Sequence, residues 1–476
     1  MMTLQQAAGW LGTASPVGES AITPLRVHTD TRTLRCGDLF VALKGEKFDA
    51  HDFLPLAKAQ GAVAAIAHRG LGDAGLPGFE VADTKLALGQ LAAGWRAQFS
   101  LPLIAVTGSN GKTTVTQMVA SILRAWKHEH VLATAGNFNN HIGVPLTLLG
   151  LTAAHQVGVV ELGMNHPGEI DYLAKLVKPS VALINNAQRE HLEFMVTVDA
   201  VADENGAVLA SLAANGTAVF PADSPYADRW RTLAGAQRVM TFALTGSADV
   251  TGTARWQGNQ WQVFATTPAG AVVFSLHIAG RHNVKNALAA TACALAAGAP
   301  LAAVAAGLGA FVPVKGRSRA LSVRAHGRDI TVVDDTYNAN PDSMQAAIEV
   351  LAELVAPRLL VMGDMGEVGD QAPRLHQEAG ALARTHSIEM LLTVGEQSAH
   401  AQMAFTGQNS AAGHFDDMTA LLAAVDAALP GVNSVLVKGS RFMKMERVVQ
   451  AIERFGRTTA LTQQEQEQKK DRPDAT

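Results

Sequence analysis

The segment 101–126, LPLIAVTGSNGKTTVTQMVASILRAW, constrains the fold more than any other part of the chain. Its apolar start, Leu101 to Val106, is typical of a buried strand, and apolar residues recur at helical spacing from Val115 to Trp126. The loop TGSNGKTT, residues 107–114, separates the two. A strand, a glycine-rich loop and a helix in this order predict a cradle in which backbone N–H groups and the helix N-terminus bind phosphate oxygens.

Two side chains of this loop carry the expected nucleotide chemistry. Lys112 can reach the terminal phosphates, and the Thr113 hydroxyl can ligate Mg²⁺. The match to the common nucleotide loop is incomplete, because Val106 stands where that pattern has its first glycine. A purely structural loop is the competing interpretation, and the flanking strand and helix favour the nucleotide one. The motif indicates ATP or GTP. The predicted phosphate contacts are Thr107, Gly108, Ser109, Asn110, Gly111, Lys112, Thr113 and Thr114.

The length and the polarity pattern predict an α/β protein of three domains. The chain has 476 residues, enough for about three domains of ordinary size. Strand-like runs at 39–43 and 62–67 predict a small α/β domain over residues 1–98. We expect residues 99–312 to form a parallel-sheet ATPase domain of the P-loop type with an added antiparallel region. In residues 313–455, helices alternate with strand-like runs at 330–333, 359–362, 390–394 and 434–437, which predicts a doubly wound, Rossmann-like sheet. Residues 456–476 form a polar tail that we expect to be disordered.

The composition narrows the classes of protein to consider. A formal net charge of −4 does not favour a nucleic-acid binder, and two distant cysteines, Cys36 and Cys293, cannot form a disulfide framework. The first residues lack the pattern of a signal peptide, and no apolar stretch reaches the length of a membrane span. We therefore expect a cytoplasmic protein without a membrane span.

Two further residues of the central segment are candidates for metal or phosphate chemistry. Glu161 ends the strand-like run that begins at Val157, and a carboxylate there can ligate Mg²⁺ held by phosphates. A helix-capping or solvated glutamate is equally compatible with the pattern. His191 follows the run Val181 to Ile184 and can bind a metal or a phosphate, although a lone histidine is often structural. Ligands of parallel sheets sit at strand carboxyl ends, which places both residues near the phosphate loop.

Polar clusters near the third segment are candidate binding loops. DDTYNANP, residues 334–341, follows a strand-like run, and it can form a binding loop, a turn with a helix N-cap, or both. Asn283 and Arg317 lie near the junction of the second and third segments, where Arg317 could bridge to a phosphate or belong to a solvated hinge loop. The clusters 30–32 and 438–441 are weaker candidates for binding anions.

Together these motifs resemble the Mur ligases, ATP-dependent amide-forming enzymes of peptidoglycan synthesis. The resemblance covers residues 29–451 and includes TGSNGKTT, Glu161, His191, GRHNVKNALAA from position 280 and the Gly-Arg pair at 316–317. GNFNNHIGVPLTLL, ELGMNHPGEI, DDTYNANPDSM, VMGDMGEVGD and VLVKGSRFMKME are most similar to the subfamily that adds D-Ala-D-Ala to UDP-MurNAc-tripeptide. The resemblance implies a monomer that uses ATP and Mg²⁺.

The resemblance also implies roles for single residues. Lys112, Glu161 and His191 would be catalytic, and Thr113, Glu161 and His191 would hold metal ions, His191 alternatively contacting the acyl phosphate. The implied nucleotide contacts outside the phosphate loop are Asn283, Arg317, Asp335, Tyr337 and Asn338. The implied contacts to the UDP-sugar in the N-terminal domain are Thr31, Arg32, Lys44 and Gly45.

One position departs from the family pattern. Many Mur ligases carry a carbamylated lysine shortly after the histidine motif, and Asn205 stands at that position in VADENGAVLASL. A bridging carbamate is therefore not available there. The candidates to replace it are Glu204, another neighbouring group or a water.

The implied mechanism passes through an acyl phosphate, protected from water by closure of the three domains at hinges near Phe99 and Val312. Alternatives stay open at this point. A ligase of the subfamily that adds a single diamino acid or lysine is the nearest one. A folylpolyglutamate synthase shares the ATP core without the extra N-terminal domain. A nucleotide-binding module that has lost catalysis would fit the missing lysine, and a switch GTPase lacks its guanine-site motifs.

Overall fold

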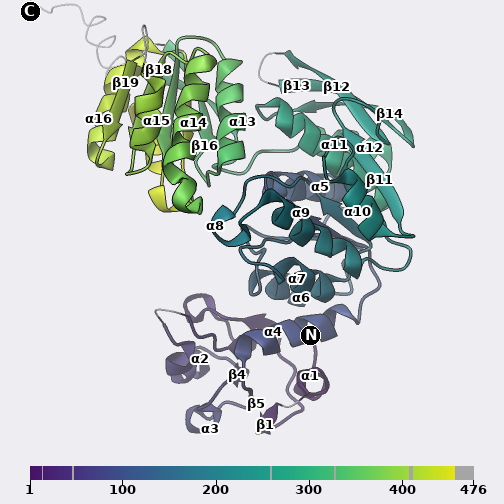
Figure 1. The fold of residues 1–476 in the computed structure, drawn as a ribbon. Coiled ribbons are helices and arrows are strands. Elements are labelled where there is room, and N and C mark those ends of the chain that lie inside the picture. The colour runs from purple at the N-terminus through teal and green to yellow at the C-terminus, as the bar shows by residue number, and fades with distance from the viewer. Residues whose placement is uncertain (13, 46–47, 258–259, 326–327, 407–410, 456–476) are drawn as a thin grey trace, which may run out of the picture.

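The computed structural model describes residues 1–455 except 13, 46–47, 258–259, 326–327 and 407–410. Three β-sheets, each with its own helices, follow one another along the chain as three domains (Figure 1). The N-terminal domain lies below the central one, and the C-terminal domain lies beside the central one on the side of α8 (Figure 1). This architecture confirms the predicted fold class. The polar tail predicted at 456–476 lies outside the described residues.

The N-terminal domain contains a five-stranded sheet of order β1-β5-β4-β3-β2, parallel except for the β1–β5 pair. The predicted strand-like runs 39–43 and 62–67 correspond to β3 and β4. The strands are β1 Ser15–Val17, β2 Arg26–His28, β3 Asp38–Val41, β4 Ala64–Ala67 and β5 Gly78–Glu80. The helices are α1 Leu4–Leu11, α2 Leu54–Ala59, α3 Leu71–Ala74 and α4 Thr84–Arg96.

The central domain contains a nine-stranded sheet of order β14-β13-β12-β11-β10-β9-β6-β8-β7. Neighbouring strands from β7 to β12 run parallel, and β12, β13 and β14 pair antiparallel at one edge, as the alternating pattern predicted. The strands are β6 Leu103–Thr107, β7 Val131–Ala133, β8 Val157–Glu161, β9 Val181–Ile184, β10 Thr217–Pro221, β11 Arg238–Ala243, β12 Val250–Gln257, β13 Gln260–Thr267 and β14 Gly270–Leu276.

Helices cover both faces of this sheet, which explains why β6 is apolar from Leu103 to Val106. Side chains alternate between the faces of a strand. Ile104 and Val106 pack into one buried cluster with α5 and α11, whereas Leu103 and Ala105 pack into another with α6 and α7. The helices are α5 Lys112–Lys127, α6 Gly143–Leu149, α7 Glu169–Val177, α8 Leu192–Met195, α9 Val198–Gly206, α10 Ala227–Ala234, α11 Arg281–Ala296 and α12 Leu301–Gly309.

The C-terminal domain contains a six-stranded sheet of order β15-β16-β20-β17-β18-β19, parallel except for the β15–β16 pair. Its strands are β15 Arg319–Ala325, β16 Arg328–Asp335, β17 Arg358–Gly363, β18 Met390–Val394, β19 Ala411–Phe415 and β20 Ser434–Lys438. Its helices are α13 Pro341–Ala352, α14 Ala372–Thr385, α15 Ser398–Phe405 and α16 Met418–Ala428, and residues 446–455 are also helical. Among the described helices of the whole chain, none is long and apolar enough to cross a membrane.

Candidate active site

The loop between β6 and α5 forms a tight cradle whose shape depends on two glycines. Gly108 and Gly111 have φ of +130° and +81°, the left-handed region that favours glycine. A Cβ atom on Gly108 would lie 3.0 Å from the backbone nitrogens of Asn185 and Asn186, at the end of β9. The Asn186 side chain accepts a hydrogen bond from the Asn110 backbone N–H at 2.8 Å. The carboxyl end of β9 therefore fixes the loop at the N-terminus of α5.

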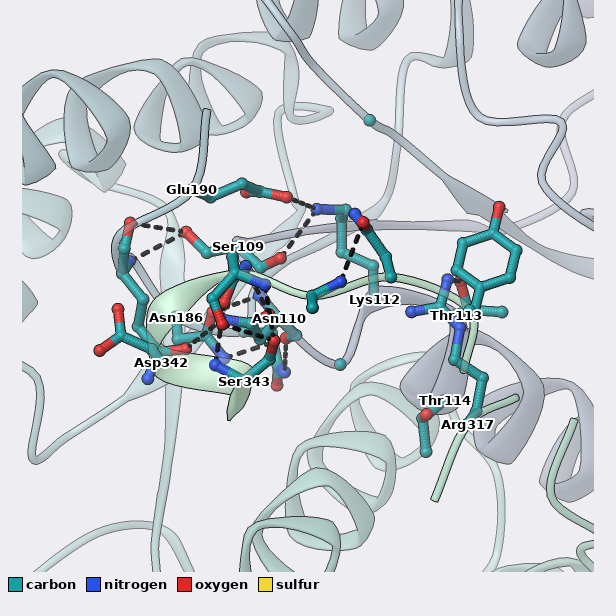
Figure 2. Close-up of a pocket in the computed structure, with 18 of the residues that line it drawn as sticks. Ser109, Asn110, Lys112, Thr113, Thr114, Asn186, Glu190, Arg317, Asp342 and Ser343 are labelled. Atoms are coloured by element: carbon teal, nitrogen blue, oxygen red, sulfur yellow. Dashed lines mark hydrogen bonds and ion pairs between the residues drawn. The ribbon is translucent and has the colours of Figure 1, made fainter. Parts of the chain in front are cut away.

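Lys112, the first residue of α5, is held over this loop. Its ammonium donates to the backbone carbonyls of Gly108 at 2.6 Å and Ser109 at 3.1 Å. It also forms an ion pair with Glu190, with 2.6 Å between Lys112 Nζ and Glu190 Oε1 (Figure 2). Both side chains are largely buried. The cation expected to bind phosphate thus lies beside a carboxylate of the loop that follows β9.

Glu161 lies at the carboxyl end of β8, next to the first turn of α5. Its Oε1 accepts hydrogen bonds from the Thr113 hydroxyl at 3.2 Å and from the Asn139 amide at 2.8 Å. Its Oε2 is buried and, among the described residues, has no hydrogen-bond partner. A buried carboxylate oxygen in that state fits a hard cation such as Mg²⁺, whose protein ligands are oxygens.

His191 connects the central domain to the C-terminal domain electrostatically. Its Nδ1 lies 2.5 Å from Glu367, which follows β17, and its Nε2 lies 3.5 Å from Glu190. Burial opposes protonation of the ring, but the interactions with Glu190 and Glu367 outweigh it and raise the pKa of His191 to about 9. These two carboxylates therefore favour the protonated form of the ring.

The C-terminal domain contributes a second wall of polar groups. Arg317 donates to the Thr113 hydroxyl at 3.2 Å, and its guanidinium lies over the Tyr337 ring at 3.8 Å from the centroid. Asp335 pairs with Lys438 at 2.6 Å, and Lys438 also donates to the Asn338 carbonyl. Burial raises the pKa of Asp335, but Lys438 outweighs it, so the net direction is downward.

These groups surround one cavity of about 480 Å³ between the central and C-terminal domains. Of the predicted site residues, it is lined by Ser109, Asn110, Gly111, Lys112, Thr113, Thr114, Glu161, His191, Asn283, Arg317, Asp335, Tyr337 and Asn338. Thr107 and Gly108 are not among the residues that line it. The Thr107 hydroxyl donates to Asn205 at 2.6 Å, so it supports the cradle from within the core.

The four predicted sugar contacts lie elsewhere, in the N-terminal domain. Thr31 and Arg32 form the short helix after β2, where Arg32 is exposed and pairs with Asp30 at 2.5 Å. Lys44 and Gly45 are exposed just after β3. None of the four is among the residues that line the cavity described above. The structure therefore brings the nucleotide candidates together and leaves the sugar candidates as a separate group.

Asn205, which stands where many family members have a carbamylated lysine, belongs to the buried core of this chain. Asn205 is fully buried, accepts from Thr107 and donates to the Val201 carbonyl at 3.0 Å. Glu204, one candidate to replace the carbamate, accepts from the backbone N–H groups of Gly168 and Ile170 at 2.8 and 2.7 Å. It therefore caps the N-terminus of α7, and it does not line the cavity.

Sequence reasoning missed Glu190, Gln188 and Glu367, all of which line the cavity. The only signal was the position of Glu190 and Gln188 after the β9 strand end, next to His191. Glu367 lies far away in the sequence, in VMGDMGEVGD, and no local pattern connects it with His191. The N-cap prediction for residues 334–341 is confirmed, because Asn340 caps α13, and the Asn340 amide also donates to the Asn110 side chain at 2.9 Å. That the same residues form a binding loop stays a prediction.

Arg189, in the central domain, forms ion pairs with two carboxylates of the C-terminal domain. Its guanidinium donates to Asp342 at 2.8 and 3.0 Å and to Glu378 at 3.1 Å, both in the C-terminal domain. We expect Arg189→Ala to shift the free protein toward a more open domain arrangement, seen as a larger radius of gyration in X-ray scattering. The shift should be partial, because partly exposed ion pairs contribute about 1 kcal/mol or less.

Arg229→Ala is the matched control, because Arg229 pairs with Asp199 and Asp203 inside the central domain. Identical scattering from both variants would contradict the role of Arg189 as a contact that holds the domains together.

Comparison with known proteins places these features in a family. Three family models match the chain: "Mur ligase family, catalytic domain" at 26–96, "Mur ligase middle domain" at 106–294 and "Mur ligase, glutamate ligase domain" at 318–441. The UDP-N-acetylmuramoyl-tripeptide–D-alanyl-D-alanine ligase of Escherichia coli K12 is 42% identical over 91% of this chain and 95% of its own length. That of Haemophilus influenzae is 40% identical over 92% of this chain and 96% of its own.

Solved structures agree with the sequence relatives. A crystal structure of MurF from Acinetobacter baumannii has a TM-score of 0.86 and 35% identity, covering 95% of this chain and 98% of its own. MurF from Thermotoga maritima in complex with ADP has a TM-score of 0.81 and 25% identity, covering 93% of this chain and 100% of its own. A folylpolyglutamate synthase of Mycobacterium tuberculosis, at 17% identity and a TM-score of 0.58, shares the fold alone.

Proposed function

The chain belongs to the Mur ligase family, and from this membership and the cavity we propose that it joins D-Ala-D-Ala to UDP-MurNAc-tripeptide with ATP as the energy source. One observation carries the chemistry: a phosphate cradle, its lysine and a buried carboxylate converge on a cavity that a second domain closes. We choose this subfamily over the one that adds a single amino acid because relatives of 40–42% identity are UDP-N-acetylmuramoyl-tripeptide–D-alanyl-D-alanine ligases. The product belongs to the synthesis of cell-wall precursors.

We assign the nucleotide to the central cavity. The loop N–H groups and Lys112 bind the phosphates, and Arg317 approaches from the domain junction beside Thr113. Asn283, Asp335, Tyr337 and Asn338 are the proposed further nucleotide contacts. Mg²⁺ fits the Thr113 hydroxyl and the Glu161 Oε2 atom, which is unpartnered among the described residues, and it would neutralise charge on the transferred phosphoryl group. His191 supports either a second metal position or, as a cation, the acyl phosphate.

The proposed reaction has two steps. The terminal carboxylate of the tripeptide attacks the γ-phosphorus of ATP, which gives ADP and an acyl phosphate. The amine of D-Ala-D-Ala then attacks the acyl carbon, and phosphate leaves through a tetrahedral intermediate. Lys112 stabilises the charge that develops on the phosphoryl oxygens. Contacts across the cavity, such as Asn340 with Asn110, hold the domains closed so that water is excluded from the acyl phosphate.

Each domain then has one principal task. The N-terminal domain, residues 1–98, binds the UDP-sugar. The proposed contacts are Thr31, Arg32, Lys44 and Gly45. Residues 99–312 bind ATP, and residues 313–455 contact the nucleotide and the dipeptide. Hinges near Phe99 and Val312 would let these units close. We further propose that the protein works in the cytoplasm as a monomer, without a nucleic-acid partner.

Omission of single components tests the function. Purified protein is mixed with ATP, Mg²⁺, UDP-MurNAc-tripeptide and D-Ala-D-Ala, and phosphate release is measured against each omission. We expect release only when both the tripeptide nucleotide and the dipeptide are present. Release with meso-diaminopimelate or lysine, on the preceding acceptor that lacks the third residue, but not with the dipeptide would move the protein to the preceding step. ATP binding without release would indicate a module that has lost catalysis.

A further inference from the structure

Glu190 lines the active-site cavity without a role in the function proposed above. It precedes His191 in the loop after β9, and its side chain is 10% exposed. Its Oε1 lies 2.6 Å from Lys112 Nζ and 3.5 Å from His191 Nε2. Figure 2 shows the Glu190 and Lys112 side chains pointing toward one another across the edge of the phosphate loop. The carboxylate is thus balanced by the lysine that the nucleotide also requires.

Charge balance requires a replacement for Lys112 when ATP binds. The proposed function moves the lysine ammonium to the phosphate oxygens, which leaves Glu190 beside several negative charges. A buried carboxylate without a cation is strongly disfavoured. His191 is not free to replace Lys112, because its Nδ1 already lies 2.5 Å from a carboxylate oxygen of Glu367. A further cation is therefore needed.

The unsatisfied atoms of the cavity indicate which cation this is. Oε2 of Glu190 is buried and has no hydrogen-bond partner in the part of the chain that the structure describes. Oε2 of Glu161, which lines the same cavity, is in the same state. Buried polar atoms are rarely left unpaired, so two such carboxylate oxygens facing one phosphate site favour divalent cations over a further amine.

We propose that Glu190 is a ligand of a second divalent cation, which takes the place of Lys112 when ATP occupies the cavity. This inference rests on the proposed function and adds to the cation assigned to Thr113 and Glu161. The described residues hold no cluster of three or more His, Cys, Asp or Glu side chains that could bind a metal ion. Phosphate oxygens must therefore complete the coordination, as is usual for Mg²⁺ at nucleotide sites.

The same arrangement explains how the chain can dispense with a lysine at position 205. Asn205 is buried in the core and carries an amide in place of a carboxylate. The Glu204 carboxylate accepts hydrogen bonds at the N-terminus of α7 and does not reach the cavity. Glu190 brings a carboxylate to the cavity from the loop after β9.

Manganese binding tests the proposal independently of activity, because Mn²⁺ accepts the same oxygen ligands as Mg²⁺. The full chain is titrated with Mn²⁺ in the presence of the non-hydrolysable analogue AMP-PNP, and free Mn²⁺ is followed by electron paramagnetic resonance. We expect two bound Mn²⁺ per chain. In Glu190→Gln the affinity for the second should fall about tenfold or more, while the first is unchanged. Glu193→Gln, an exposed glutamate of α8 just after His191, is the matched control and should behave as the unaltered chain does.

Glu190→Asp, which keeps the charge, is the second variant should Glu190→Gln fail to fold, and it should also weaken the second Mn²⁺. Two equally tight Mn²⁺ in the folded Glu190 variants would overturn the inference alone and leave Glu190 as a mere partner of Lys112. A single Mn²⁺ in the unaltered chain would do the same. Failure of the unaltered chain to bind AMP-PNP would overturn the proposed function, and the inference with it.

Discussion

Lys112→Ala is expected to lower the turnover number for ligation roughly 10²- to 10³-fold or more, the usual effect of removing one charge-stabilising donor from a transition state. Lys112 opens α5 and lies over the carbonyls of Gly108 and Ser109, so its ammonium is already at the phosphate cradle. Alanine keeps the helix and removes the charge that would face the transferred phosphoryl group. Phosphate release in the complete reaction mixture is the measurement, with the circular-dichroism spectrum as the check of the fold.

The Lys112→Ala variant also leaves Glu190 without its cation, which by itself can destabilise the protein. The double variant Lys112→Ala/Glu190→Gln removes that unpaired charge and should be as inactive as the single variant. Lys127→Ala, at the other end of the same helix, should retain activity. Substantial ligation by Lys112→Ala would contradict the assigned role.

Glu161→Gln is expected to lower the turnover number about 10²-fold or more, because a lost metal ligand forfeits several kcal/mol of transition-state stabilisation. Glutamine has nearly the same shape and retains an acceptor for the Thr113 hydroxyl. It removes a buried charge, one oxygen of which has no partner among the described residues. The midpoint of thermal unfolding should therefore stay equal or rise, while activity falls.

The combination of these two readouts separates a functional from a structural role for Glu161. A lower unfolding midpoint together with nearly normal turnover would identify Glu161 as a structural residue at the end of β8. Glu349→Gln, on the exposed face of α13, is the matched control and should change neither quantity.

Much of the fold could be predicted because its strands are buried on both faces and therefore continuously apolar. β9 and β18 match their predicted bounds, and β6, β8, β16, β17 and β20 differ from theirs by two residues or fewer at each end. β7, β10, β11, β15 and β19 were not singled out. The order of strands in the sheets could not be predicted either, because pairing depends on contacts between residues far apart in the chain.

The site shows the same division between local and long-range information. The phosphate loop, Glu161 and the strand-end position of His191 follow from local patterns and from the family resemblance. The Lys112–Glu190 and His191–Glu367 pairs do not, because each joins residues 78 or more positions apart, across loops and between domains. The absence of a lysine at position 205 was evident from the sequence, but the burial of Asn205 against Thr107 was not.

Transfer of oxygen from substrate to phosphate tests the central claim most directly. UDP-MurNAc-tripeptide labelled with ¹⁸O in its terminal carboxylate is incubated with the enzyme, ATP, Mg²⁺ and D-Ala-D-Ala, and the products are analysed by mass spectrometry. Ligation through an acyl phosphate predicts UDP-MurNAc-pentapeptide and one ¹⁸O atom in each phosphate released. Unlabelled phosphate, or phosphate formed without the pentapeptide product, would contradict the account.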